Sequence, residues 1–281
     1  MNNVIERGKA IVEVKNEVKV NNRNAYFKEI ALSRLGETKV NNVGSRMWIV
    51  GYTSAMDMAV QFMDEFVVNG VTYRHFCNGA VRNPNDISVH GHGCVGVGDY
   101  KVSIDGNLTR QYQTWVSMIK RCYSSNSKKK NPTYTECIVS DAWLNFQVFA
   151  TWYDENYYEV AGEATAIDKD ILLKRNKVYS ASTCVFVPQA VNNLFTKNDA
   201  SRGNYPLGVS RHKPGSKYQS DCRNGGGEGQ YLGLYSTPEE AFEVYRKFKE
   251  ERIKQVAESY KGIIPEKLYR ALISYEVEIN D

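Results

Sequence analysis

The stretch from Gly203 to Tyr260 constrains the fold most, because its punctuation leaves few arrangements open. Three short runs of alternating apolar and polar residues are separated by turns rich in glycine and proline, and an amphipathic stretch from Thr237 follows them. Alternation with a period of two is typical of strands, and a capping box with proline at the first helical position marks a helix start. The pattern therefore predicts a three-stranded sheet backed by one helix over residues 201–262.

Positive charge is concentrated in the strand part of this segment. Residues 202–235 contain five Lys or Arg residues and two acidic residues, whereas the whole chain carries a formal net charge of only +4. A basic sheet surface favours nucleic acid as the partner, because Arg suits guanine edges and Lys suits phosphates. The alternative is that these cations are ordinary solvated surface residues. We expect the outward face of the sheet to carry the cations. The candidate DNA-binding side chains are Arg211, Lys213, Lys217, Tyr218 and Arg223.

The totals describe an ordinary globular chain. Its 281 residues allow one large domain or two to three small ones, with 42% hydrophobic and 24% charged residues. No apolar run approaches the roughly 18 residues needed to cross a bilayer, and the N-terminus lacks the order of a signal peptide. The six cysteines include no C-x-x-C pair, which favours reduced thiols. We therefore expect a cytoplasmic protein with no membrane partner.

The first part of the chain has a β pattern. After a lead-in segment over residues 1–34, short β-branched and aromatic runs over residues 35–84 are punctuated by glycine and asparagine turns. Asn69-Gly70 is typical of a tight hairpin turn. We predict a small SH3-like β-barrel over residues 35–84, and a linker over residues 85–110, which are rich in Gly, Asn and Asp.

From Tyr112 the apolar spacing becomes helical. One helix face and a second helix beginning near Asp141 are indicated, with a basic loop at residues 124–131 between them. The loop has two compatible readings, a solvated connection and a phosphate contact. The predicted buried face of the first helix consists of Tyr112, Trp115, Met118, Ile119 and Cys122.

Two carboxylates mark the most chemically specific stretch. Asp168 and Asp170 are two residues apart in a predicted strand, so their side chains point the same way and could hold one divalent cation. Asn192 lies on a predicted short helix after Pro188 and could complete the site. The alternative is structural: both acids pair with neighbouring cations or cap turns.

Taken in order, these motifs resemble the phage and prophage HNH-endonuclease-like proteins. In many members an ethylene-response-factor-type (AP2-like) DNA-binding domain follows, and residues 203–260 resemble that domain. The resemblance covers roughly residues 35–260. It is carried by Tyr112-x-x-Trp115-x-x-Met118-x-x-Arg121-Cys122-Tyr123, Val139-x-x-x-Trp143-x-x-Phe146-x-x-Phe149, Asp168-Lys-Asp170-Ile, Tyr179-Ser-x-x-Thr-Cys184-x-Phe-Val-Pro and Asn192-Asn193.

The resemblance implies a helical ββα-metal region over residues 111–200, in which a histidine activates water and one Mg²⁺ stabilises the leaving oxygen. The implied catalytic residues are Asp168, Asp170 and Asn192, with the two aspartates as metal ligands and either Asn176 or Asn192 assisting. This chain departs from the pattern because no histidine lies between His92 and His212. A carboxylate or a metal hydroxide is the remaining candidate for the base.

We therefore expect an α+β, multi-domain, phage-type protein in the cytoplasm of a bacterial host, with double-stranded DNA as its partner. Residues 263–281 are predicted to form a C-terminal tail. One hypothesis is a homing-endonuclease-like enzyme that hydrolyses DNA with Mg²⁺. The other is a catalytically silent protein that regulates DNA or binds a host protein to inhibit a defence system.

Overall fold

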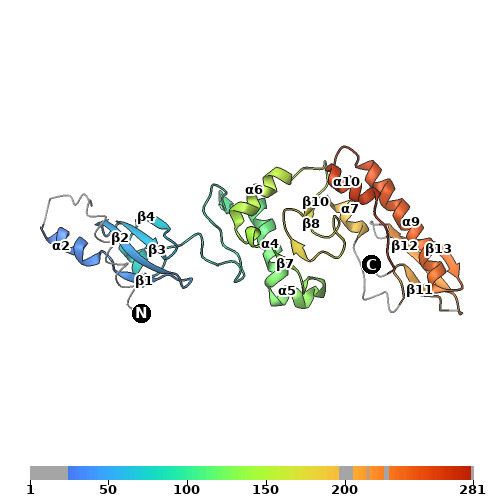
Figure 1. Cartoon of the computed structure of the whole chain (residues 1–281), viewed down its shortest axis with the longest axis horizontal. Coiled ribbons are helices and arrows are strands. Elements are labelled where there is room, and N and C mark those ends of the chain that lie inside the picture. Colours follow the sequence, from blue (N-terminus) through green and yellow to red (C-terminus); the bar gives the residue numbers. More distant parts are fainter. Residues whose placement is uncertain (1–24, 196–204, 214, 225–227, 280–281) are drawn as a thin grey trace. The chain divides into compact units, whose positions relative to one another are not determined.

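The computed structural model describes residues 25–195, 205–213, 215–224 and 228–279 of the chain (Figure 1). The predicted lead-in lies largely outside these residues. The chain divides into two compact units, which we call the first unit (Met1–Ile104 with Leu144–Gln147) and the second unit (Asp105–Trp143 with Val148–Asp281). Helices and several small sheets are mixed along the chain, so the predicted α+β class is confirmed. Among the described residues, no helix is both long and apolar enough to cross a membrane.

The first unit is built on a four-stranded antiparallel sheet in the order β1-β2-β3-β4. Alternate residues of β2 and β3 are buried, as expected for a sheet with one face on a core. That core includes Met47, Ile49, Val60 and Phe62, with Ala31 packed against it. The elements are α2 (Ala25–Arg34), β1 (Thr38–Val40), β2 (Arg46–Ser54), β3 (Asp57–Phe62), β4 (Val67–Val71) and α3 (Tyr73–Cys77).

Two expectations for this sheet were wrong. The described strands form an open sheet and not a closed barrel, with β1 and β4 at its edges. Asn69-Gly70 lies inside β4, where the register shifts from Met58 opposite Val71 to Val60 opposite Val68. Gly70 has a φ of +67°, which suits a bulge as well as a hairpin turn, so the dipeptide alone did not distinguish them.

The start of the predicted linker is held on the first sheet by a polar network. The Asp64 carboxylate accepts the side-chain amides of Asn83 and Asn85, at 2.7 to 3.1 Å. Asp86 is buried and accepts the Asn41 amide at 2.7 Å and the Ser45 hydroxyl. Buried polar groups are usually paired in this way, and the pairing keeps the segment ordered. Two short strands follow, β5 (Ser103–Ile104) and β6 (Asn107–Leu108).

The helical part of the second unit follows the predicted apolar spacing. In α4, Trp115, Met118, Ile119 and Cys122 are all buried, which confirms that face, while Tyr112 is half-buried. The predicted basic loop was wrong, because its residues form the short helix α5, whose final lysines suit the negative end of a helix dipole. The elements are α4 (Arg110–Tyr123), α5 (Ser125–Lys130), η1 (Pro132–Tyr134), η2 (Asp141–Leu144) and α6 (Phe146–Asn156).

Two small strand pairs follow in the second unit. β7 pairs with β9 in parallel, and β8 pairs with β10 in antiparallel. The Trp152 ring of α6 stacks on Phe186 of β10 at 5.3 Å, which joins the helices to the second pair. The elements are β7 (Ile138–Val139), β8 (Thr165–Asp168), β9 (Val178–Tyr179), β10 (Val185–Pro188) and α7 (Gln189–Leu194).

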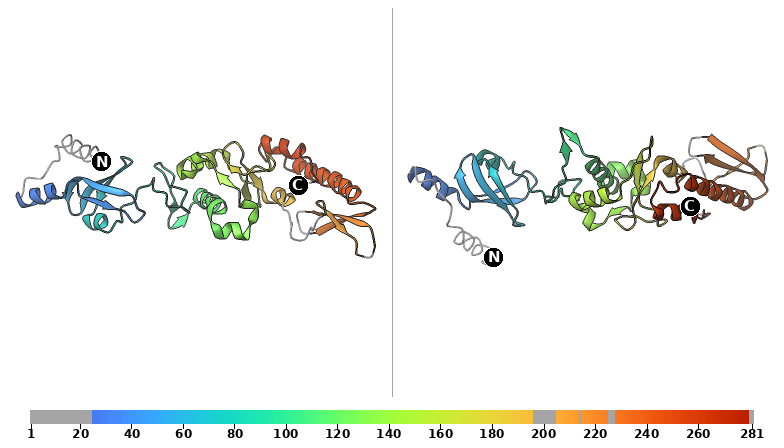
Figure 2. Two further views of the ribbon diagram at one scale, coloured as in Figure 1. Left: turned by 60° about the horizontal axis from the view of Figure 1, so that its bottom comes forward. Right: turned by 90° about the horizontal axis from the view of Figure 1, so that it is seen from above.

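The C-terminal sheet has the strand order β11-β12-β13, and the long helix α9 lies beside it (Figure 2). Thr237 caps α9 by accepting the backbone N–H of Glu240 at 3.2 Å, as the capping box predicted. Three strands and a helix were therefore correctly predicted here. The elements are β11 (Val209–Arg211), β12 (Tyr218–Asn224), β13 (Glu228–Tyr235), α9 (Pro238–Ser259) and α10 (Glu266–Ile273).

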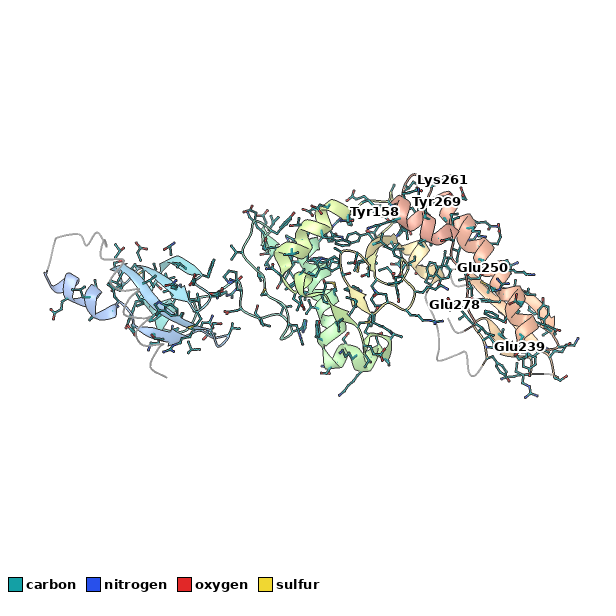
Figure 3. All side chains as sticks on the ribbon, viewed as in Figure 1. Tyr158, Glu239, Glu250, Lys261, Tyr269 and Glu278 are labelled. Carbon is teal, nitrogen blue, oxygen red and sulfur yellow. The ribbon has the colours of Figure 1, made fainter. Side chains whose placement is uncertain are left out.

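One continuous core joins the sheet of β11–β13 to β10 and α7, since Val187 and Val191 cluster with Phe242 and Ile253. The described residues after α10 belong to this body. Glu250 of α9, labelled in Figure 3, accepts the backbone N–H of Val277 at 2.9 Å. Glu278 pairs with Lys174 at 3.2 Å and Arg175 at 2.6 Å. The described part of the predicted C-terminal tail, residues 263–279, is therefore packed within the second unit.

Candidate metal centre and nucleic-acid interface

Asp168 is the last residue of β8, and the strand ends where its carboxylate binds the backbone that follows. Its Oδ1 accepts the backbone N–H of Asp170 at 3.0 Å and that of Ile171 at 2.7 Å. Such aspartate turns compete with strand pairing, so the chain leaves the sheet at this point. The prediction that both carboxylates project from one strand was wrong, because Asp170 lies beyond its end.

The turn nevertheless brings the two carboxylates close enough for their charges to interact. Burial, followed by the negative charge of Asp170, raises the pKa of Asp168 to about 6. The two backbone amides act in the opposite direction and hold the carboxylate in place. A bound divalent cation relieves such like-charge repulsion between carboxylates.

Lys169 lies between the two acids in sequence, and its side chain is only 8% exposed. Its Nζ is 3.0 Å from Asp170 Oδ2 and 5.8 Å from the centre of the Tyr179 ring. Burial opposes the charge, yet Asp170 raises the pKa of Lys169, so the ammonium stays charged. Asn176 donates to the backbone oxygens of Lys169 and Val178 at 2.7 Å each, which fixes the loop that follows.

Asn192 lies in α7, and the strand register bears on its role. Asp168 pairs with Val185, whereas Thr165 pairs with Pro188, the residue before α7. The helix therefore begins at the opposite end of β8 from Asp168. The assignment of Asn192 as a further ligand stays a prediction.

The carboxylate pair fits an incomplete magnesium site. In the described part of the chain, no group of three or more His, Cys, Asp or Glu side chains could hold a metal ion. Mg²⁺ keeps several waters and is usually bound by one or two carboxylates together with substrate phosphates. In the same part of the chain, Asp168 Oδ2 and Asp170 Oδ1 accept no N–H donor. Two oxygens of the protein could thus hold the ion, with phosphate oxygens and water completing its shell.

The register of the C-terminal sheet divides the predicted DNA-binding residues. Val209 pairs with the buried Ser220, and Arg211 pairs with Tyr218. Because side chains alternate along a strand, Arg211 and Tyr218 project from the side that also carries Val209 and Ser220, which α9 covers. The expectation of Arg211 on the outward face was therefore wrong, although its side chain is exposed near the strand end.

The outward face presents different side chains from those expected. His212 Nδ1 lies 3.3 Å from Gln219 Oε1, and the Gln219 amide donates to the Asp221 carboxylate at 2.8 Å. Tyr231, which pairs with Asp221, is 58% exposed. The distribution of cations in the sequence does not reveal this face, because it depends on which strand positions are buried, as Val209 and Cys222 are.

The remaining candidates lie around the ends of these strands. Lys213 and Lys217 are exposed in the connection between β11 and β12. Arg223 lies in β12 opposite Gly229, and its side chain is outside the described part of the structure. The Tyr218 ring packs edge-on against Tyr205 at 5.5 Å, so Tyr218 has a packing role within the sheet.

Comparison with protein-family models, with curated proteins and with solved structures gives no match for this chain.

Proposed function

We propose that the protein binds double-stranded DNA through its second unit and hydrolyses a phosphodiester bond with one Mg²⁺ held by Asp168 and Asp170. The observation that carries the proposal is the carboxyl pair itself. Burial, followed by the negative charge of Asp170, raises the pKa of Asp168 to about 6, and the buried Lys169 lies alongside. Perturbed carboxyl pairs of this kind cluster at functional sites.

The order of elements around the pair supports an HNH-like reading. β8 and β10 form an antiparallel pair, and α7 follows directly, in the order strand, strand, helix. We take these three elements as the ββα-metal unit. We take the sheet of the first unit as an SH3-like module in an open form, and β11–β13 with α9 as an AP2-like reader.

The residues around the pair have distinct tasks in this proposal. When bound, the ion would stabilise negative charge on the leaving phosphate oxygen. Asp168 would hold it through Oδ2, because two backbone amides fix Oδ1. Lys169 orients Asp170 through the 3.0 Å ion pair, and Asn192 stays a candidate for assisting the site.

The C-terminal sheet would enter the major groove. Its outward Gln219 can pair with adenine, and the exposed Tyr231 offers an aromatic surface for apolar contact. Lys213 and Lys217 at the strand connection would contact phosphates, as surface lysines commonly do. Arg211 and Arg223 stay candidates for guanine or phosphate contacts.

Plasmid cleavage tests the enzyme proposal. We expect the wild-type chain to nick or cut supercoiled plasmid in Mg²⁺ or Mn²⁺, and the Asp168→Asn/Asp170→Asn variant to bind the plasmid without cutting it. Glu155→Gln is the matched control, because this acid is exposed on α6. Cleavage retained by the double variant would show that the catalytic centre lies elsewhere.

A catalytically silent protein is the second candidate. The observation that favours it is the ion pair between Lys169 and Asp170, which already places a cation beside the carboxylates. In this alternative the chain regulates DNA or inhibits a host defence protein. DNA binding with no cleavage in either metal would select it over the nuclease.

A further inference from the structure

Arg121 carries a positive charge that no acid offsets among the residues that the structure describes. It lies in the last turn of α4, half-buried, with its guanidinium 6.0 Å from the centre of the Tyr134 ring. Its side chain also hydrogen-bonds to Tyr179, which is buried. Within the described ranges, no carboxylate lies within ion-pair distance of Arg121. The two tyrosines fix the direction of the guanidinium without neutralising it.

Three lysines surround the same place. Lys169 extends towards the ring of Tyr179, and Lys177 donates to the backbone oxygen of Thr133 at 3.5 Å. The positive charges of Lys128 and Lys169 both act on the buried thiols of Cys122 and Cys137. The four cations therefore lie around one location, where α4, β7 and β9 meet.

The acids near these cations do not cancel them. Lys169 is paired with Asp170, and Glu136 lies 4.0 Å from Lys177 at a site where the glutamate side chain is 79% exposed. Such exposed pairs contribute little and are readily exchanged for another anion. Asp168 and Asp170 are the carboxylates assigned to Mg²⁺. Arg121 and Lys177 are thus left to receive an external anion.

We propose that Arg121 and Lys177 clamp a DNA backbone phosphate next to the carboxylate pair, as a second DNA contact separate from the C-terminal sheet. The inference rests on the proposed function, because it is the passing DNA strand that supplies the anion. An arginine guanidinium suits a phosphate, because its planar fork can make two parallel hydrogen bonds. The backbone joins the two places: Lys177 directly precedes β9, and β9 carries Tyr179, which lies close to both Arg121 and Lys169. Arg121 is a positioning residue: it holds one phosphate of the DNA strand, so that the next phosphate lies at the carboxylates.

The salt dependence of DNA affinity tests the clamp in the full-length chain. Each lost phosphate contact reduces the slope of log affinity against log salt by about 0.9. We expect Arg121→Gln and Lys177→Gln each to weaken binding to a duplex and to reduce this slope by about one contact. The control is Lys120→Gln, which removes an exposed cation from the same helix and should leave the slope unchanged.

The outcomes separate the clamp from the proposed function. Arg121→Lys should recover most of the salt slope, because it restores the positive charge. If Arg121 had only a structural role, Arg121→Gln would leave the slope unchanged. Lys177 is 43% exposed, so its variant reports on DNA even if Arg121→Gln fails to fold. If wild type binds DNA and both Gln variants keep its slope, the clamp is wrong and the proposed function stands. If the wild-type chain binds no DNA, both the clamp and the proposed function are wrong.

Discussion

The carboxylate of Asp168 accepts the backbone N–H of Asp170 at 3.0 Å, so a tight turn brings the two acids together. The arrangement has an electrostatic cost, because Asp170 helps to raise the pKa of Asp168. In the proposed function, the turn holds the two carboxyl groups where one Mg²⁺ would join them.

The first prediction concerns stability against pH. The pKa of Asp168 is about 6 in the folded chain and 3.8 for an unperturbed aspartate. Between these values the folded chain keeps a proton that the unfolded chain releases. The free energy of unfolding therefore falls as pH rises through this window, and the loss is complete above about pH 6.

Asp168→Asn should remove that loss of stability, because the amide stays uncharged at every pH in the window. The amide oxygen can still accept both backbone N–H groups. We expect the variant to be more stable than wild type at pH 7 by about 1–2 kcal/mol, as one pKa unit corresponds to about 1.4 kcal/mol and the site is partly solvated. The difference should vanish near pH 4. Thermal unfolding across pH 4–7 measures it, with Glu155→Gln as control. Equal curves for Asp168→Asn and wild type would contradict the raised pKa.

The second prediction concerns Lys249, which is 8% exposed beneath the C-terminal sheet. Burial lowers its pKa, and the charge of Arg252 acts in the same direction. Lys249→Met should raise the free energy of unfolding at pH 7 by about 1–3 kcal/mol, because burial disfavours the charged ammonium.

The sign of this effect follows from the proton balance. The folded chain releases the Lys249 proton more readily than the unfolded chain, so wild type gains stability as pH rises towards 10.5. The advantage of Lys249→Met should therefore shrink at high pH. Lys247→Met, at an exposed position on the same helix, is the control. A variant less stable than wild type at pH 7 would count against this account.

The third prediction tests how closely the C-terminal sheet packs on α9. Gly208 has a φ of +75°, and a Cβ there would lie 2.0 Å from the Tyr245 ring. Gly208→Ala should lower stability by more than about 2 kcal/mol through strain and overpacking. Gly262→Ala is the matched control: its φ is +77°, but nothing lies within 4 Å. Similar losses in both variants would mean that the ring contact contributes nothing.

The fourth prediction separates the two faces of the same sheet. If the outward face enters DNA, Tyr231→Ala should weaken binding and change the sequence preference, because Tyr231 is 58% exposed there. Arg211→Ala should mainly reduce the salt dependence, since it lies on the opposite side near the strand end. Binding assays with several duplex sequences measure both. If Arg211→Ala instead changed the sequence preference and Tyr231→Ala did not, the face that carries Arg211 would be the one that contacts the bases.

Local sequence patterns predicted individual helices and strands well, but they predicted strand register and the facing of side chains poorly. The spacing of Trp115, Met118 and Ile119 identified a helix face, and Thr237 identified a helix start, because each signal depends only on neighbouring residues. The bulge at Gly70 and the placement of Arg211 depend on strand register, which one sequence does not specify.

The candidate site shows the same limit. Asp168 and Asp170 could be chosen from their spacing, but the turn that joins them depends on competition between side-chain and ladder hydrogen bonds. Arg121 was visible in the sequence only as one motif residue. The structure shows Tyr134 and Tyr179 beside it, and no carboxylate in the described part of the chain pairs with it.

The central claim is that Asp168 and Asp170 hold one Mg²⁺ when DNA is bound. Calorimetric titration of Mg²⁺ into the complex with a cleavage-resistant duplex tests it most directly. We predict one additional ion per chain in wild type and in Glu155→Gln, and none in Asp168→Asn/Asp170→Asn. Equal Mg²⁺ uptake by the double variant would contradict the account.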